Sequence, residues 1–383
     1  MKIFRFIGCF LIIFSACKTH TDTSYNSLRS LLVNKIDIIE LSSNDDQSRI
    51  LISPYHQGKV LASTYNGAEG VYNGWINPLG LQDLDKNKKL IGGEERLWLS
   101  PLGGQFSFYY QQIKPIHDDN WLVPDVMSAE AYTVDKINKQ DVQLSKEMQL
   151  TNFIGASFNF RIDRKIALLN KTSIQKNLNI EIDNKTQFVA FETYNTLTNL
   201  DTIAWQKETG LVGLWSAGMY NGADDSVVIV PIQNNVSKND ILQYFGEMQT
   251  DRFQIKNGAI LFKGDGSYKC KIGIPNTYAS PIYGCYTKSR NRLTIIQYRK
   301  TNDSKFSNSF VAVLDNPYVG ETIPIYNNDQ DFFELESNAP LKELNPMEKT
   351  AHWHRVYHFS SDVQTLNAMA KKLLGVDLEH CYF

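Results

Sequence analysis

The sequence predicts a mainly β protein, built as a large antiparallel sandwich with a few short helices. Three observations support this fold class. Short runs of aromatic and β-branched residues recur along the chain, each bounded by Gly, Asn, Asp or Pro. Helical periodicity is confined to a few short segments, and no Pro- or Ser-rich linker divides the chain after Tyr25. The runs expected to form strands are residues 49–53, 59–64, 105–110, 158–162, 186–194, 227–231, 293–298 and 310–314.

Helices are expected in few places. Leucine and isoleucine residues recur at helical spacing over residues 28–36, which predicts one short amphipathic helix. Ser237 followed by Asp240 is a capping pattern that predicts a brief helix. Ser361 is expected to begin another, with an apolar face that ends at Gly375.

The N-terminus is typical of a bacterial lipoprotein. A short basic start precedes an apolar run over residues 6–14, and the small residues Ser15 and Ala16 stand directly before Cys17. The run is well short of the roughly 20 residues that span a bilayer. We expect residues 1–16 to be a lipoprotein signal peptide, 17–40 a lipidated tether with a short helix, and 41–383 a single β domain. The alternative is an ordinary cleaved signal, without lipid on Cys17.

Composition narrows the class of partner. A formal net charge of −2 with 21% charged residues gives no basic field for nucleic acid. Aromatic residues make up 12% of the chain, which suits stacking on sugar rings and suits a large β core equally well. Cys270 and Cys285 allow either a disulfide or two buried thiols in an exported protein. No Cys-x-x-Cys pair indicates zinc.

A first candidate site lies in the Gly-Gly-Glu-Glu-Arg-Leu-Trp segment at residues 92–98. Paired glycines let a backbone pass close to a ligand. Glu94 and Arg96 supply two charges, and Trp98 supplies a stacking face. The planar fork of Arg96 suits hydroxyls or a carboxylate. The alternative is a tight turn whose Arg and Glu pair with each other in solvent.

A second candidate site lies at residues 333–340. Glu334 and Glu336 alternate with Leu335, so on a strand both carboxylates point to one face. Two carboxylates on one face repel, and at least one is expected to have a partner or a raised pKa, which favours proton transfer. The alternative is a solvated acidic edge.

A third candidate is a run of histidines in residues 352–359. Strand alternation aligns His352, His354 and His358 on one face. A His-x-His pair is a reasonable metal-ligand geometry, with Glu336 as a third donor. The alternatives, which we favour over a metal, are hydroxyl binding or simply a solvated sheet face, and no cofactor is expected.

These segments together resemble a known class of proteins. Residues 92–98 resemble the Gly-Gly-x-Arg-Leu-Trp segment of galactose-mutarotase-like proteins. Residues 333–340 resemble the aldose 1-epimerase segment that carries the catalytic glutamate in a Leu-Glu-Thr-Gln context, which here is Leu-Glu-Ser-Asn. Residues 191–199 resemble the strand and turn before the middle of that fold. Over roughly residues 45–375 the chain is similar to a family of bacterial lipoproteins within this superfamily.

The resemblance implies an antiparallel β-supersandwich with a sugar site on a concave face. It makes Glu336 the candidate base and Arg96 a substrate contact. Aldose 1-epimerases carry a histidine acid after the middle turn, whereas residues 209–219 contain no histidine. His352 or His354 would have to replace it as the acid, because mutarotation needs both a base and an acid.

We therefore expect a carbohydrate-binding lipoprotein of the cell envelope, held on a membrane, with the outer membrane favoured. The residues expected to contact the sugar, besides Arg96 and Glu336, are Glu94, Trp98, Trp215 and Glu334. One alternative is a carbohydrate-active enzyme (epimerase, lyase or hydrolase) that uses Glu336 with a histidine. A second is a structural surface lipoprotein.

Overall fold

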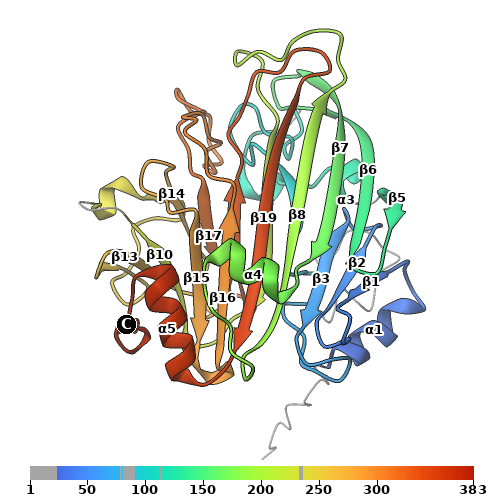
Figure 1. Ribbon diagram of the computed structural model, residues 1–383. Helices are drawn as coiled ribbons and strands as arrows, with labels where there is room; N and C mark the ends of the chain where they lie inside the picture. The colour runs from blue at the N-terminus through green and yellow to red at the C-terminus, as the bar shows by residue number, and fades with distance from the viewer. Residues whose placement is uncertain (1–23, 78–79, 81–90, 113, 129, 233–235) are drawn as a thin grey trace, which may run out of the picture.

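The protein is mainly β, as the sequence predicts, and most of its strands belong to two large antiparallel sheets. The computed structural model describes residues 24–77, 80, 91–112, 114–128, 130–232 and 236–383. The predicted signal peptide and Cys17 lie outside these residues. The larger sheet has ten strands (Figure 1). In spatial order they are β12 (Phe253–Lys256), β13 (Ala259–Lys263), β10 (Ser226–Pro231), β15 (Ile282–Thr287), β16 (Arg292–Tyr298), β19 (Lys349–Ser360), β8 (Gln187–Asn199), β7 (Ser157–Leu168), β6 (Asp141–Thr151) and β5 (Thr133–Ile137).

A six-stranded sheet packs against the ten-stranded one. Leu97, Leu214 and Leu335 of the smaller sheet share one hydrophobic core with Phe191 and Val356 of the larger. This shared core makes the two sheets a sandwich. The strands of the smaller sheet, in order, are β11 (Leu242–Gln243), β14 (Cys270–Ile274), β17 (Ile323–Asn327), β18 (Phe332–Asn338), β9 (Gly213–Asn221) and β4 (Arg96–Ser100).

Smaller elements cover the edges and the outer surface. A three-stranded sheet of β1 (Ile39–Ser42), β2 (Arg49–Ser53) and β3 (Lys59–Thr64) packs on helix α1 (Tyr25–Val33). Helices α4 (Lys171–Leu178) and α5 (Val363–Leu374) build a second core with the ten-stranded sheet, on the face turned away from the six-stranded one (Figure 1). Other helical segments in the described residues are α3 (Asp125–Ser128), η2 (Asp118–Asn120), η3 (Lys238–Asp240), η4 (Lys288–Arg290) and η5 (Leu378–His380). Within the described residues, no helix is both long and apolar enough to cross a membrane.

Several predicted elements are confirmed. Residues 49–53 and 59–64 coincide with β2 and β3, and the helix expected within residues 28–36 is α1. Helix α5 ends at Gly375, whose φ of 70° is the left-handed conformation that favours glycine. Its N-cap is Asp362 rather than the predicted Ser361, because the Asp362 side chain accepts from the backbone N–H of Thr365.

Other predictions are wrong for identifiable reasons. Residues 105–110 and 310–314 are irregular rather than strands, and the Gln105 side chain hydrogen-bonds both the N–H and the C=O of Leu314 between the two segments. The helix expected after Ser237 stops after one turn, since the chain enters β11 and pairs with β14. Cys270 and Cys285 are both free thiols, on strands of different sheets.

Candidate functional site

The register of three strands places two predicted site residues on one face of the six-stranded sheet. Arg96 on β4 pairs with Ala217 on β9, and Ala217 pairs with Glu336 on β18. Residues paired directly across antiparallel strands share a face, so the Arg96 and Glu336 backbones lie two strand spacings apart, about 10 Å. The next residue, Ser337, points the opposite way and bonds to His354 of the ten-stranded sheet. Arg96 and Glu336 therefore occupy the face turned away from that sheet, here called the outer face.

Two of the donor nitrogens of Arg96 have no acceptor among the residues described. Its Nη2 donates to Glu334 Oε1 at 3.0 Å, and its guanidinium lies 4.2 Å from the centroid of the Trp98 ring. The residue is only 2% exposed, yet Nε and Nη1 have no hydrogen-bond acceptor among the residues described. Leaving a buried polar group unpaired costs about 1–3 kcal/mol. An additional acceptor at either nitrogen would complete its hydrogen bonding.

Glu336 is fully buried and held by two donors. Trp215 Nε1 donates to Glu336 Oε2 at 2.7 Å, and Lys271 Nζ lies 3.3 Å from Oε1. Burial raises the pKa of Glu336 to about 7, with a further increase from the neighbouring Glu334 carboxylate, while the Lys271 ammonium opposes the shift. A carboxyl that titrates near pH 7 can both accept and release a proton under physiological conditions.

Lys271 and Glu321 belong to this cluster and were missed by the sequence analysis. The Lys271 ammonium lies 5.2 Å from the Trp215 ring centroid. Glu321 is fully buried two residues before β17 begins, and burial raises its pKa while Lys271 opposes the rise. The signal for Lys271 is visible in the sequence as a lone charge in the apolar run Cys-Lys-Ile-Gly-Ile of β14. A buried lysine in such a strand needs a carboxylate partner.

Aromatic rings border the charged cluster. The Trp98 and Trp215 rings meet edge to face, with centroids 5.3 Å apart. Trp98 also contacts Tyr109 and Trp121, which stack on each other at 5.5 Å with an interplanar angle of 7°. The rings thus form a continuous aromatic group beside the Arg96 guanidinium, and aromatic faces of this kind pack well against the C–H groups of a ligand.

The paired glycines serve the protein's own packing. A Cβ on Gly92 would lie 2.1 Å from the carbonyl oxygen of Trp75, and φ at Gly92 is 82°. A Cβ on Gly93 would lie 2.4 Å from Cδ of Lys59, whose Nζ donates to the Gly92 carbonyl at 2.9 Å. The close approach that these glycines permit is therefore to neighbouring chain segments.

Glu94 lies on the interior side of the smaller sheet, away from Arg96. Its carboxylate accepts from Ser63 Oγ at 2.8 Å and lies 2.7 Å from His358 Nε2. The next residue, Glu95, pairs with the buried Arg164 of β7. The alternative of a solvent-exposed Arg–Glu pair is wrong, because Glu94, Glu95 and Arg96 are all buried. The prediction that Glu94 joins Arg96 in one site is also wrong.

His352 and His354 also lie between the sheets. Ser337 Oγ bridges them, at 2.8 Å from His352 Nε2 and 2.8 Å from His354 Nδ1. Because Ser337 and Glu336 are consecutive on β18, their side chains point to opposite faces. The expectation that these histidines share a pocket with Glu336 is therefore wrong. Burial lowers the pKa of each histidine to about 3, which keeps both neutral.

The metal alternative fails for the same reason. Glu336 lies across β18 from the histidines and does not complete a three-ligand set with His352 and His354. No group of three or more His, Cys, Asp or Glu suited to a metal ion occurs in the described part of the chain.

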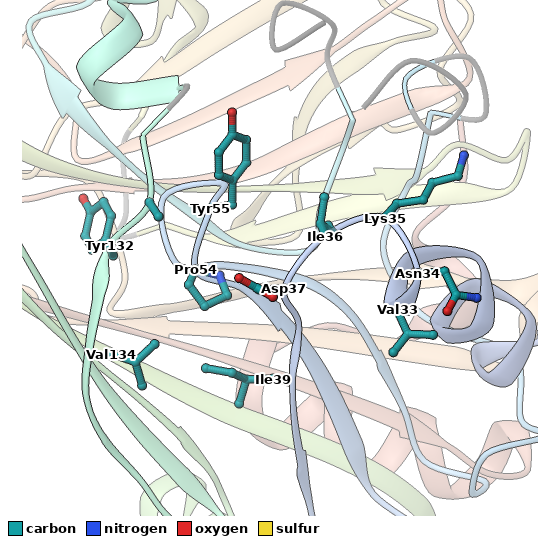
Figure 2. A pocket seen from close by; sticks show the side chains of 11 residues that line it. Val33, Asn34, Lys35, Ile36, Asp37, Ile39, Pro54, Tyr55, Tyr132 and Val134 are labelled. Atoms are coloured by element: carbon teal, nitrogen blue, oxygen red, sulfur yellow. The ribbon is translucent and has the colours of Figure 1, made fainter. Parts of the chain in front are cut away.

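A separate cavity lies near the end of α1 (Figure 2). Its volume is about 810 Å³, and Figure 2 shows Tyr132 and Val134 at the left of the view and Val33, Asn34 and Lys35 at the right. None of the predicted site residues lines it. The predicted residues that the structure brings together are Arg96, Trp98, Trp215, Glu334 and Glu336 on the outer face, and their roles toward a ligand stay predictions.

Solved structures share this fold at low sequence identity. A protein from Escherichia coli K12, provisionally assigned as an aldose 1-epimerase, is 12% identical, with 84% of this chain and 98% of that chain covered and a TM-score of 0.51. The Slr1438 protein from Synechocystis sp. PCC 6803 is 12% identical, with 85% and 97% covered and a TM-score of 0.53. These likenesses confirm the galactose-mutarotase-like β-supersandwich and establish the fold alone. No curated protein sequence matches the chain.

A family model matches nearly the whole chain, from residue 23 to residue 382. The match spans both sheets of the sandwich and every residue of the outer-face cluster. The chain therefore belongs to DUF6786, a family of unknown function.

Proposed function

We propose that the protein binds a carbohydrate on the outer face of the six-stranded sheet. The observation that carries this proposal is Arg96, whose buried Nε and Nη1 have no acceptor in the described part of the chain and whose guanidinium lies over the ring of Trp98. Sugar rings present acceptor oxygens at their edge and apolar C–H groups on their faces. A guanidinium fork beside an indole matches both features.

The rest of the cluster supplies the complementary groups. Glu334 and Glu336 are acceptors for sugar hydroxyls, and Lys271 is a donor. Trp98 and Lys271 each keep 8% of their surface, so a ligand would enter from their side. The mutarotase-like fold of the solved structures supports a carbohydrate ligand by analogy only.

The test compares the sugar affinity of wild type with that of Arg96→Lys and of a matched control variant. Lysine keeps the positive charge but lacks the planar guanidinium, so at least one charge-assisted hydrogen bond to the sugar is lost. Such a bond contributes roughly 1.5–3 kcal/mol, so the affinity should fall at least about tenfold. Arg252→Lys is the control, since Arg252 is also buried, pairs with Asp265 and lies over the ring of Tyr268. Binding of galactose, glucose and their oligomers is measured by calorimetry. Equal affinity in Arg96→Lys and wild type would contradict the proposal.

An enzyme that interconverts sugar anomers is the second candidate, favoured by the pKa of Glu336 near 7 and by Lys271 beside it. Glu336 would take the proton of the anomeric hydroxyl while Lys271 gives one to the ring oxygen, which opens the ring to the aldehyde. Lys271 would then replace the histidines as the acid. Polarimetry of fresh α-galactose tests this function. If wild type and Glu336→Gln give the same mutarotation rate, the enzyme function is contradicted and only the binding function is left.

We also propose that lipid on Cys17 holds the protein on a membrane of the cell envelope. The support is the apolar run followed by Ser15, Ala16 and Cys17. Cys17→Ser should lose palmitate labelling and move to the soluble fraction, whereas Cys381→Ser should do neither. Unchanged membrane fractionation of Cys17→Ser would contradict anchoring. A membrane-bound chain that binds and converts no sugar would be a structural lipoprotein.

A further inference from the structure

The ten-stranded sheet carries an uncovered hollow on the surface turned away from the six-stranded sheet. Helices α4 and α5 pack on part of that surface, and Figure 1 shows the upper ends of β19, β8 and β7 extending beyond them. Tyr194 on β8 points outward there and is 41% exposed, while its neighbours Thr193 and Asn195 are buried inside the sandwich. The exposed ring of Tyr194 can pack against the C–H groups of a ligand.

Two cavities meet at Tyr194. One of about 520 Å³ extends toward Arg299 and Lys349, and another of about 120 Å³ extends toward β6. Asp163, Tyr194 and Thr196 line both. Together they form a groove, here called the Tyr194 groove, whose larger part falls within the roughly 300–1,000 Å³ typical of small-ligand sites.

The charges of the groove are unequally satisfied. Asp163 pairs with Arg161 at 2.8 Å, and Glu348 accepts from the backbone and side chain of Asn345 at 2.9 and 3.0 Å. Asp163 is thus paired with a cation, whereas Glu348 and a third lining carboxylate, Asp135, have no ion-pair partner among the residues described.

The cations are not all engaged. Lys342 pairs with Asp303 at 3.5 Å. Arg299 donates Nη1 to the carbonyl of Ala351 at 3.0 Å, which fixes its guanidinium at the groove. Among the residues described, neither Arg299 nor Lys349 has a carboxylate partner. Lys165 also lacks a carboxylate partner among the residues described, so three cations without an ion pair face two such carboxylates, and the groove carries one excess positive charge. Arg299 and Lys349 lie with the exposed ring of Tyr194 and the hydroxyls of Thr196 and Thr350 in the larger cavity.

We propose that the Tyr194 groove binds an acidic saccharide, with a hexuronate unit whose carboxylate pairs with Arg299 and Lys349 and whose ring packs on Tyr194. A planar guanidinium binds a carboxylate through two parallel hydrogen bonds. Threonine hydroxyls at the rim suit sugar hydroxyls as donors and acceptors. This site lies on the other sheet from Arg96 and Glu336 and is independent of the function proposed for them.

The test compares two soluble probes on the full-length chain. Trigalacturonic acid should bind, neutral cellotriose should bind at least about tenfold more weakly, and affinity for the acid should fall in 0.5 M NaCl because surface charges are screened. Arg299→Gln and Tyr194→Ala should each weaken binding of trigalacturonic acid by about tenfold.

Arg290→Gln is the matched control, since Arg290 is also exposed and donates to a backbone carbonyl, that of Asn221. This variant should keep wild-type affinity for the acidic probe. Equal binding of the two probes, no binding of the acid, or unchanged affinity in both Arg299→Gln and Tyr194→Ala would overturn the proposal. Thermal melting of each variant confirms that it is folded, since Tyr194, Arg290 and Arg299 all lie at the surface.

Discussion

Replacing Glu336 by glutamine should change how stability depends on pH. In the folded protein, burial raises the pKa of this carboxyl from 4.5 to about 7. Between these values the folded chain keeps the proton that the unfolded chain releases. The stabilising contribution is therefore full below pH 4.5 and is lost as pH rises through 7.

The magnitude follows from the size of the shift. A change from 4.5 to about 7, at 1.36 kcal/mol per pKa unit, makes wild type lose about 3 kcal/mol of unfolding free energy across this range. Glutamine has no such titration. The free energy of unfolding of Glu336→Gln minus that of wild type should therefore rise by about 2 to 3 kcal/mol between pH 5 and pH 8.

Urea denaturation at pH 5, 6, 7 and 8 measures this difference. Buried histidines act in the opposite direction, since their pKa values are lowered, but they cancel in the comparison of the two chains. Lys271→Met is the control for the cause, because loss of the ammonium should raise the Glu336 pKa further and move the upper limit of the range above 7. A difference that stays constant from pH 5 to pH 8 would refute the assignment of a raised pKa to Glu336.

Three further substitutions test the fold. As pH falls from 6.5 to 4.5, wild type should lose about 2 kcal/mol more unfolding free energy than His354→Gln, because the unfolded histidine takes up a proton while the folded one, with a pKa of about 3, does not. Equal acid sensitivity of the two chains in denaturant titrations would contradict this. Gly92→Ala should lower stability by several kcal/mol, since its Cβ would lie 2.1 Å from the Trp75 carbonyl; a melting temperature within a degree of wild type would count against the register of this turn. Leu335→Ala should cost about 2–5 kcal/mol in urea denaturation because Leu335 is fully buried in the shared core, and a loss below 1 kcal/mol would argue against that packing.

Local patterns predicted much of the site correctly within single strands. Alternation placed Glu334 and Glu336 together on one face of β18, and it placed His352 and His354 together on one face of β19. Period-two alternation is a property of the extended backbone itself, so it needs no knowledge of neighbouring strands.

Only the tertiary structure decided which face of β18 points between the two sheets and which points to the outer face. Every residue of β18 is buried, so no polar and apolar alternation marks its inner side. The carboxylates of Glu334 and Glu336 are buried because Arg96 and Lys271 reach them from β4 and β14, and Arg96 is 238 residues away from Glu334 in sequence. Such pairings depend on strand order, which local sequence does not encode.

The sequence by itself thus determined the strand-rich class, the position of several strands and helices, and which side chains share one face of a strand. The tertiary structure decided that Glu336 meets Lys271 rather than a histidine. The physical reason is the pleat of β18, which sends Ser337 toward the histidines between the sheets and Glu336 toward the outer face. A shift of one residue in the pairing of that strand would have exchanged the two.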